Sequence, residues 1–419
     1  MDEKWKSIWS LCIFSSLISH ILSKEELNSK LIEAEKTILV GYAKKLGITY
    51  ESPLGIYDYF GQILYINDTS DKVDSFIHNI EWQNAKYFVS NNLLRRMPPL
   101  YFFLDSLDEE YEHAPQYWLK CQRGLFGAIT DLLREPVIRE KIHVILCIRD
   151  TVFASICRTE NQTKISHESH IINLHWNRNT LKYFLEKKIE KLKSCYFIKQ
   201  NSNKDIFNWL GIDTIHNVTR NIDENIIDYI LRHTRHTPRD VINICNSLSS
   251  LTMKIKENKA LDIQKEIRLI VSSCAKEIGD ELITICAKQV VVDEIPEEAG
   301  KHDFSSAYTS VDEYTKSRFI HIRTMLSECG KDHFSDSDIQ NIEKKAKTIF
   351  NTDVHLTDIM WMNGMLGYVR LFEGKEIPTF YMENNSISTI MPSNYQQYVL
   401  KSYMIDALDL VDIRSIPVK

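Results

Sequence analysis

The stretch LYFFLDSLDEE, residues 100–110, decides the fold class of this chain. Leu100–Leu104 is a run of five apolar residues without the alternation of a strand that has one solvated face, and it ends directly at Asp105. A continuous apolar run of this length is typical of a strand that is buried on both faces of a parallel sheet. The stretch therefore predicts a central strand that delivers an aspartate to the carboxyl edge of an α/β sheet.

A second apolar run, Val144–Ile148, predicts a neighbouring strand. Between the two runs, the pattern from Tyr117 to Arg134 predicts a helix that ends near Pro136. Strand, helix and strand make a βαβ unit with parallel strands. Residues 171–175 are a third candidate strand, followed by a predicted helix over residues 179–192.

The composition is that of a globular protein and argues against several classes. Hydrophobic residues make up 43% and charged residues 26% of the chain, which is ordinary. The formal net charge of -6 argues against a surface that coats nucleic acid, although not against one basic patch. The nine cysteines include no CxxC pair and no Cys/His cluster with zinc spacing, which favours reduced thiols in a cytoplasmic protein.

The beginning of the chain contains an apolar segment, Ile8–Leu22, of about signal-peptide length. Acids precede it, no small-residue cleavage site follows it, and it is too short and too polar to span a bilayer. Trp5, Trp9 and Cys12 recur at helical spacing. We therefore expect a buried amphipathic helix here and no membrane partner.

The remaining segments differ in character. Residues 222–290 read as wholly helical, with Asp223 and Thr237 as candidate N-caps and Pro238 at a first helical position. The predicted domains are an α/β core over residues 1–215, a helical lid over 216–290, a polar linker over 291–310, a winged-helix-like α+β domain over 311–400 and a tail over 401–419.

The winged-helix prediction depends on three short helices and a hairpin. The helices are expected at Tyr314–Leu326, Asp336–Phe350 and His355–Met365, and the hairpin at residues 367–382 with Gly374 in its turn. The second helix carries Lys344, Lys345 and Lys347, whereas the third, which would be the recognition helix, has no lysine or arginine. Base readout usually needs such side chains, so packing or protein interaction is favoured over DNA reading.

The candidate chemistry lies at the ends of the two predicted strands. Asp105 could hold the water shell of Mg²⁺, and Asp108 and Glu109 could polarise an attacking water. Alternatively, these acids cap the next helix. Arg149, just after the second run, could contact a γ-phosphate or simply pair with a nearby acid. Arg239 in the first turn of a helix could bind an anion or pair with Asp240.

These segments resemble a known family. The stretch YFFLDSLDE (101–109) resembles the Walker B segment of STAND-type P-loop NTPases, bacterial relatives of the AAA+ ATPases, and HVILCIRD (143–150) resembles their sensor-1 strand. LHWNRNTLKYFLEKKI (174–189) and RHTPRDVINICNSL (235–248) resemble segments that follow, the latter in a helical lid. The resemblance implies a P-loop NTPase-type parallel sheet with ATP and Mg²⁺ as cofactors. It assigns Asp105 to Mg²⁺, Asp108 and Glu109 to catalysis, and Arg149 and Arg239 to sensing.

The chain departs from that family at the phosphate loop, whose pattern is GxxxxGK[ST]. Gly-Lys pairs occur at positions 300, 330 and 374, and none of them has the required flanking residues. In the resembled family the loop precedes a segment similar to WKSIWSLCIF (5–14), so we expect the missing part before Met1. Whether the chain hydrolyses ATP is therefore left open.

Two classes of function follow. The first is an ATPase-like switch of the STAND/AAA+ type that binds or hydrolyses ATP only if the missing part is supplied, with a protein partner or self-association, in a signalling context such as defence against phage. The second is a non-enzymatic module that binds protein or DNA through its lid and winged helix. An initiator-like DNA binder is a third possibility.

Overall fold

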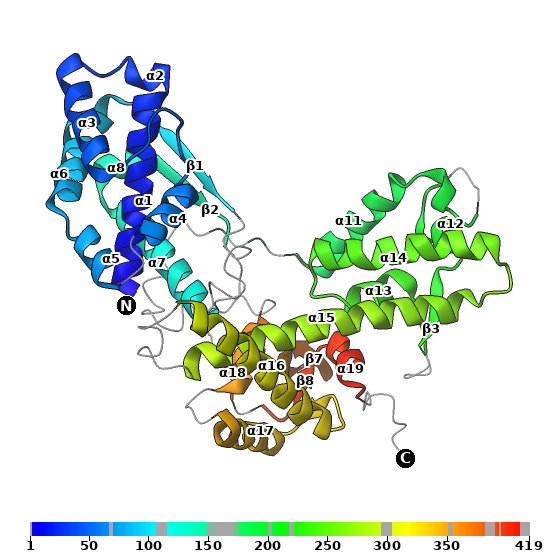
Figure 1. Ribbon diagram of the computed structural model, residues 1–419. Coiled ribbons are helices and arrows are strands. Elements are labelled where there is room, and N and C mark those ends of the chain that lie inside the picture. The colour runs from blue at the N-terminus through cyan, green and yellow to red at the C-terminus, as the bar shows by residue number, and fades with distance from the viewer. Residues whose placement is uncertain are drawn as a thin grey trace. The chain divides into compact units, whose positions relative to one another are not determined.

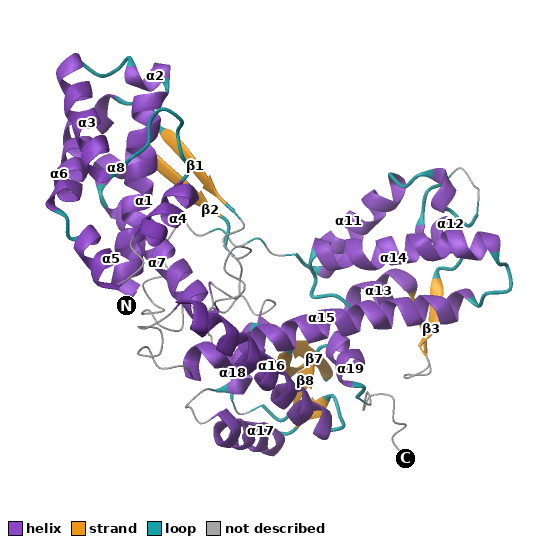
Figure 2. Cartoon of the chain, in the orientation of Figure 1, coloured by secondary structure: helices purple, strands orange, loops and turns teal. Residues whose placement is uncertain are grey.

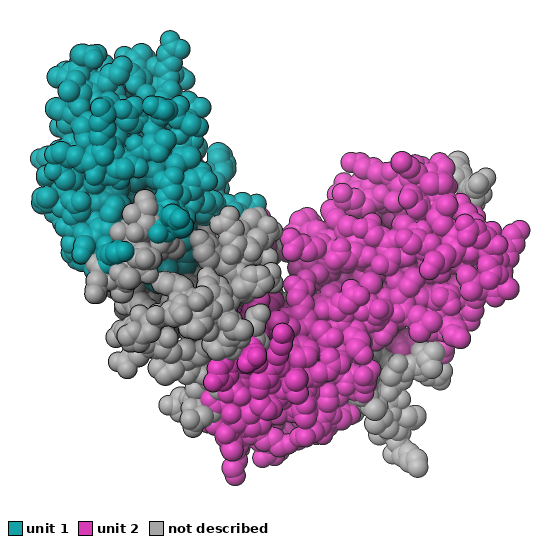
Figure 3. All heavy atoms as spheres, in the orientation of Figure 1, with its two compact units in different colours: residues 1–156, 297–309 teal, residues 157–296, 310–419 magenta. Residues whose placement is uncertain are grey.

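The computed structural model shows a mixed α/β protein that is mostly helical, with small sheets (Figures 1 and 2). It divides into two compact units (Figure 3): unit 1 comprises residues 1–156 and 297–309, and unit 2 comprises residues 157–296 and 310–419. The structure describes residues 2–66, 70–105, 115–148, 176–199, 203–217, 222–294, 304–350, 355–381, 390–393 and 395–410, and single positions 153, 172 and 174.

Unit 1 is a layer of helices packed on a small parallel sheet. Its elements are α1 (Asp2–Ser23), α2 (Glu25–Asn28), α3 (Glu33–Leu46), α4 (Ile56–Ile66), α5 (Ser70–Ile77), α6 (Ile80–Phe88), a π-helical turn η1 (Val89–Leu93), a 3₁₀ turn η2 (Leu94–Arg96), β1 (Leu100–Leu104), α7 (Pro115–Arg134), α8 (Pro136–Lys141) and β2 (Ile142–Leu146).

The predicted buried N-terminal helix is confirmed as α1. Ile8, Trp9 and Cys12 are buried, and the indole of Trp9 stacks on Phe60 of α4 with ring centroids 4.1 Å apart. α1 also packs along α7, where Gly124 leaves room for the backbone of α1. Within the described residues, Glu3–Ser23 is the one helix long and apolar enough to cross a membrane, and 67% of its apolar window is buried inside the structure, as in a core helix.

The predicted strand–helix–strand unit is confirmed. β1 and β2 pair in parallel, with Leu100 opposite Ile142 and Leu104 opposite Leu146, and α7 lies between them in the chain. The second strand begins and ends two residues earlier than predicted. The expectation that both strands are buried on both faces is wrong, because Tyr101 is 60% and Phe103 is 73% exposed. A continuous apolar run does not show whether both faces of a strand are covered, and here alternate side chains face solvent.

Unit 2 contains two groups of helices and two antiparallel sheets. Its elements are α11 (Arg178–Glu190), a 3₁₀ turn η3 (Ser194–Tyr196), α12 (Ile206–Leu210), β3 (Thr214–Asn217), β4 (Ile222–Asn225), α13 (Ile226–Arg232), α14 (Pro238–Glu257), α15 (Ile263–Glu294), α16 (Phe304–Glu328), β5 (His333–Phe334), α17 (Asp336–Phe350), α18 (Leu356–Met362), β6 (Leu366–Phe372), β7 (Lys375–Thr379), β8 (Tyr398–Leu400) and α19 (Ser402–Leu408).

The region predicted to be wholly helical, residues 222–290, begins with a strand. β4 pairs antiparallel with β3, and Asp223 lies in β4 opposite His216. The N-cap of α13 is therefore Asn225, whose side chain accepts a hydrogen bond from the amide of Ile227. The predicted start of α14 is confirmed: the Thr237 side chain accepts from the amide of Asp240, and proline occupies the first turn.

The carboxyl-terminal part of unit 2 follows the predicted order of three helices and a hairpin. α17 spans the predicted residues 336–350. β6 and β7 form the hairpin, and Glu373 and Gly374 both have positive φ, which is the geometry of a tight two-residue hairpin turn. The four strands lie in the order β5-β8-β6-β7, so β8 is an inner strand of the sheet.

Two of the predicted segments look different in the structure. The end of α15 and the start of α16 extend into the predicted linker 291–310 from both sides, and only residues 295–303 of it lie outside the described part. The predicted tail 401–419 begins with α19, which buries Tyr403, Met404 and Ala407. Unit 2 also contains residues 157–215, which the sequence placed with the first domain, together with the lid and winged-helix segments.

Candidate functional site

The carboxyl edge of the β1–β2 pair is the best-defined candidate site in unit 1. Leu104 and Leu146 end their strands side by side, and the amide of Cys147 donates to the carbonyl oxygen of Leu104 over 2.9 Å. Asp105 follows immediately and is exposed. The hydroxyl of Tyr57 in α4 donates to the backbone oxygen of Asp105 over 3.4 Å. The structure thus places an exposed carboxylate where a buried parallel strand ends.

The first turns of α1 lie at this same end of the sheet. His20, near the end of α1, contacts Phe102 in the middle of β1, with ring centroids 6.0 Å apart. Trp9, two turns from the start, contacts Tyr57, the side chain that reaches Asp105. α1 therefore runs antiparallel to β1, and its beginning lies at the end of unit 1 toward which the strands point (Figure 1).

The chemistry of Asp105 fits a partial magnesium site. Mg²⁺ is usually held by one or two carboxylates together with phosphates and waters, rather than by a complete protein cage. Consistent with this, the described residues contain no cluster of three His, Cys, Asp or Glu side chains that could hold a metal. Three predicted site residues, Asp108, Glu109 and Arg149, lie outside the described residues.

Arg239, the last predicted site residue, is exposed in the first turn of α14 in unit 2. Asp240, which the sequence offered as its alternative partner, pairs with Arg235 instead. The Arg235 Nε and Nη2 atoms lie 2.9 and 2.7 Å from the two carboxylate oxygens of Asp240, and the Arg235 amide also donates to Asp240. Asp240 is 1% exposed, so this bidentate pair is part of the packed interior.

Arg235 also reaches α15. Its Nη1 atom lies 3.1 Å from Glu281, whereas burial of the guanidinium opposes its charge and the bonds to Asp240 and Glu281 support it. The balance raises the pKa of Arg235 above its ordinary value. The sequence analysis did not single out Arg235. The signal that could have found it is its place five residues before an acid in the first turn of a helix, where a bend in the chain can bring the two together.

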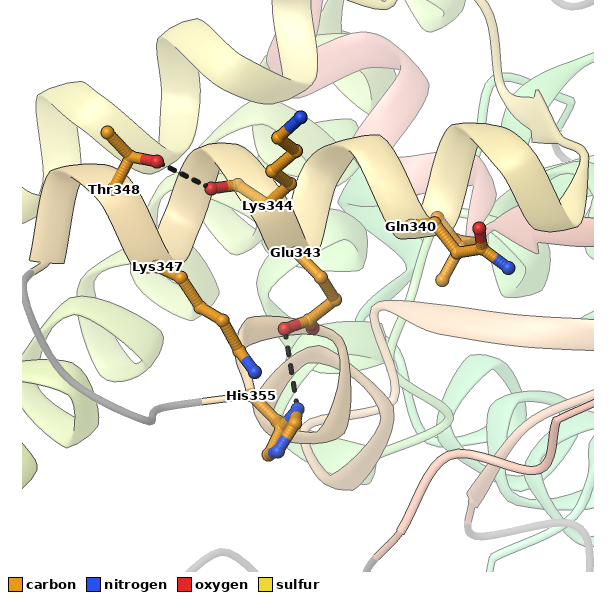
Figure 4. Close-up of a pocket in the computed structure, with 7 residues that line it drawn as sticks. Gln340, Glu343, Lys344, Lys347, Thr348 and His355 are labelled. Atoms are coloured by element: carbon orange, nitrogen blue, oxygen red, sulfur yellow. Dashed lines mark hydrogen bonds and ion pairs between the residues drawn. The ribbon is translucent and has the colours of Figure 1, made fainter.

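A shallow hollow lies between α17 and the start of α18 (Figure 4). Glu343 lies in the middle of it, where its Oε1 atom accepts hydrogen bonds from the amide and hydroxyl of Thr357, and its Oε2 atom faces His355 Nδ1 at 3.5 Å. Lys344 and Lys347 also line the hollow, and within the described part of the chain neither makes an ion pair. Lys345 points elsewhere and pairs with Glu328.

α18 itself offers no side chains for reading bases. Leu356, Thr357, Ile359, Met360, Trp361 and Met362 of this helix are all buried. This burial agrees with the sequence-based preference for packing over DNA reading by this helix.

Comparison with known proteins adds no identification. Neither a family model, a curated protein nor a solved structure matches the chain.

Proposed function

We propose that this chain is an ATPase-like signalling switch of the STAND/AAA+ type, with its nucleotide end at the carboxyl edge of β1 and β2. The observation that carries the proposal is the position of Asp105. It directly follows a strand that is paired in parallel and in register with a second strand across a helical crossover. Ligands of open α/β folds bind at this edge of the sheet.

The placement of α1 supports the proposal. Its first turns lie at the Asp105 end, and the dipole of a helix directs partial positive charge toward its beginning. An anionic ligand at this edge would therefore meet both an amino-terminal helix end and a carboxylate able to hold its metal ion. Figure 1 shows the strands and the beginning of α1 at the same end of unit 1.

The residues would divide the work as the resemblance implies. Asp105 would hold the hydrated Mg²⁺ that neutralises phosphate charge. Asp108 and Glu109 would orient and polarise water, and Arg149 and Arg239 would respond to the γ-phosphate. None of the Gly-Lys pairs in the chain fits a phosphate loop, so the proposed switch binds ATP weakly unless a phosphate-binding segment is supplied. A cytoplasmic location, and a protein partner or self-association, complete the proposal.

Isothermal calorimetry with Mg²⁺ and ATP tests this assignment. The variant Asp105→Asn keeps the shape of the side chain and removes its charge, and we expect it to weaken binding at least about tenfold. Glu140→Gln is the matched control, because Glu140 is an exposed acid in α8, just before the opposite end of β2. We expect this control to bind like the wild type.

A second function, DNA contact through the carboxyl-terminal part of unit 2, is favoured by one observation. Lys344 and Lys347 lie on the same hollow of α17 without carboxylate partners in the described part of the chain, and such lysines can contact a phosphate backbone without reading bases. Binding of duplex DNA should then be independent of sequence and should weaken as salt rises. A Lys344→Gln, Lys347→Gln double variant should flatten the salt dependence. Absence of binding at low salt would dismiss this function.

A further inference from the structure

A buried cluster of three side chains joins α19 to the helices of unit 2. His233, at the end of α13, is 4% exposed. Its Nε2 atom lies 3.3 Å from Asp406 Oδ2 of α19, and Ser272 of α15 donates its hydroxyl to Asp406 Oδ1 over 2.6 Å. We call His233, Ser272 and Asp406 the clasp. It connects residues that are far apart in the sequence.

The surroundings of the imidazole favour its charged form. The other ring nitrogen, Nδ1, lies 2.7 Å from the backbone oxygen of Tyr229, and a carbonyl oxygen only accepts hydrogen bonds. A carboxylate also only accepts, so His233 can donate to both partners only when both ring nitrogens carry a proton. Loss of either proton would break one of these bonds inside a closed site, where an unsatisfied polar group is costly.

Asp406 keeps its negative charge despite partial burial. Burial alone would raise the pKa of its carboxyl group, but His233, the Ser272 hydroxyl and Arg232 overcome that effect and hold the pKa below the ordinary value. Above the ordinary aspartate pKa the carboxylate is therefore fully ionised, and its contribution to docking is lost only in acid. Between weakly acidic and weakly alkaline pH, the imidazole is the partner in this pair that can change charge.

The other charged groups near the clasp are paired among themselves. Arg232 of α13 donates to Glu224 of β4 over 3.0 Å and lies over the Tyr229 ring. Arg268 of α15 donates to the backbone oxygen of His216. Burial raises the pKa of Tyr229 to about 12, so its hydroxyl stays neutral in the same range of pH.

The remaining contacts of α19 do not depend on pH in this range. Gly279 of α15 lets the two helices approach closely, because a Cβ there would lie 2.3 Å from Ala407 Cβ. Arg323 donates to the backbone oxygen of Ala407 at the end of α19 over 2.9 Å. The Tyr403 hydroxyl donates to Gly364 O over 2.9 Å. The clasp therefore adds a titratable contact to an otherwise fixed interface.

We propose that the clasp makes the docking of α19 sensitive to pH: protonated His233 holds Asp406 and thereby α19 against α15, and deprotonation loosens this helix. Its sign follows from the bonds above. A proton bound more tightly in the docked state stabilises docking at lower pH, and this contribution disappears as the pH rises and the imidazole becomes neutral. The device leaves β8 and the rest of the sheet in place and acts on the helix that follows.

Amide hydrogen exchange at the end of α19 tests the proposal on the full chain. Exchange is measured at about pH 5.5 and about pH 8, which bracket the range where histidine changes charge, and is corrected for the intrinsic chemical rate. We expect protection in the wild type to fall about tenfold at the higher pH, as for the loss of one charge-assisted hydrogen bond. Equal protection at the two pH values would overturn the proposal.

Three variants make the result specific. His233→Gln should remove the difference between the two pH values, and a difference that persists in this variant would contradict the proposal. Ser272→Ala is the matched control, because it removes a hydrogen bond to the same carboxylate without removing a titratable group. It should lower protection by the same factor at both pH values. If His233→Gln does not fold, Asp406→Asn keeps the side-chain shape, removes the charge, and should also abolish the difference.

Discussion

At the residue scale, two arginines four positions apart in the sequence play different parts. Arg235 is held by the buried Asp240 and by Glu281, whereas Arg239 is exposed at the start of α14. The sequence correctly indicated the N-cap at Thr237 and the proline after it, because capping depends on local residues. It could not indicate which arginine Asp240 would choose, because that depends on the bend of the chain before α14, where His236 has a positive φ.

This difference predicts unequal costs for the same substitution. Arg235→Met should lower the free energy of unfolding by about 3–5 kcal/mol, because it leaves the Asp240 carboxylate buried without its partner. Arg239→Met should change it by less than about 0.5 kcal/mol, as at other exposed sites. Urea denaturation followed by circular dichroism measures both variants. Equal effects would show that the Arg235–Asp240 pair does not carry the stability assigned to it.

At the element scale, the strand–helix–strand unit was predictable and its surroundings were not. The apolar runs at 100–104 and 144–148 identified the two strands, and their parallel pairing followed from the helix between them. The exposure of Tyr101 and Phe103 did not follow, because an apolar run has the same letters whether one face or both are covered. Likewise, β4 escaped prediction because Asp223 and Asn225 are typical of caps and turns rather than strands.

The packing of α1 on α7 predicts opposite effects for two glycines in helices of unit 1. A Cβ at Gly124 would lie 2.4 Å from Trp5 Cβ and 2.7 Å from the Trp5 carbonyl carbon, so Gly124→Ala should force the helices apart and cost about 1–3 kcal/mol. Gly61 of α4 has open space around it. Gly61→Ala should therefore stabilise by about 0.5–1 kcal/mol.

Urea unfolding monitored by tryptophan fluorescence distinguishes the two variants, because Trp5 and Trp9 both lie in α1. Stabilisation by Gly124→Ala would contradict the close approach of α1 and α7 that the structure shows.

At the scale of the whole molecule, the sequence gave the order of the elements better than their grouping. The lid helices and the carboxyl-terminal helices and hairpin belong to one compact unit, and α15 contacts α14, α18 and α19. A polar segment with proline and glycine had indicated a boundary there, but composition does not reveal that a helix before such a segment packs against elements that follow it. For the candidate site, the sequence predicted Asp105 at the end of a strand, whereas the contribution of Tyr57 depends on tertiary packing.

The most direct test of the proposed function is the calorimetric titration of the whole chain with ATP, carried out with and without Mg²⁺. The proposal predicts weak binding that requires Mg²⁺, falls at least about tenfold in Asp105→Asn and is unchanged in Glu140→Gln. Binding that is equally strong in Asp105→Asn, or no heat at high ATP concentration, would contradict the assignment of the nucleotide end to the carboxyl edge of β1 and β2.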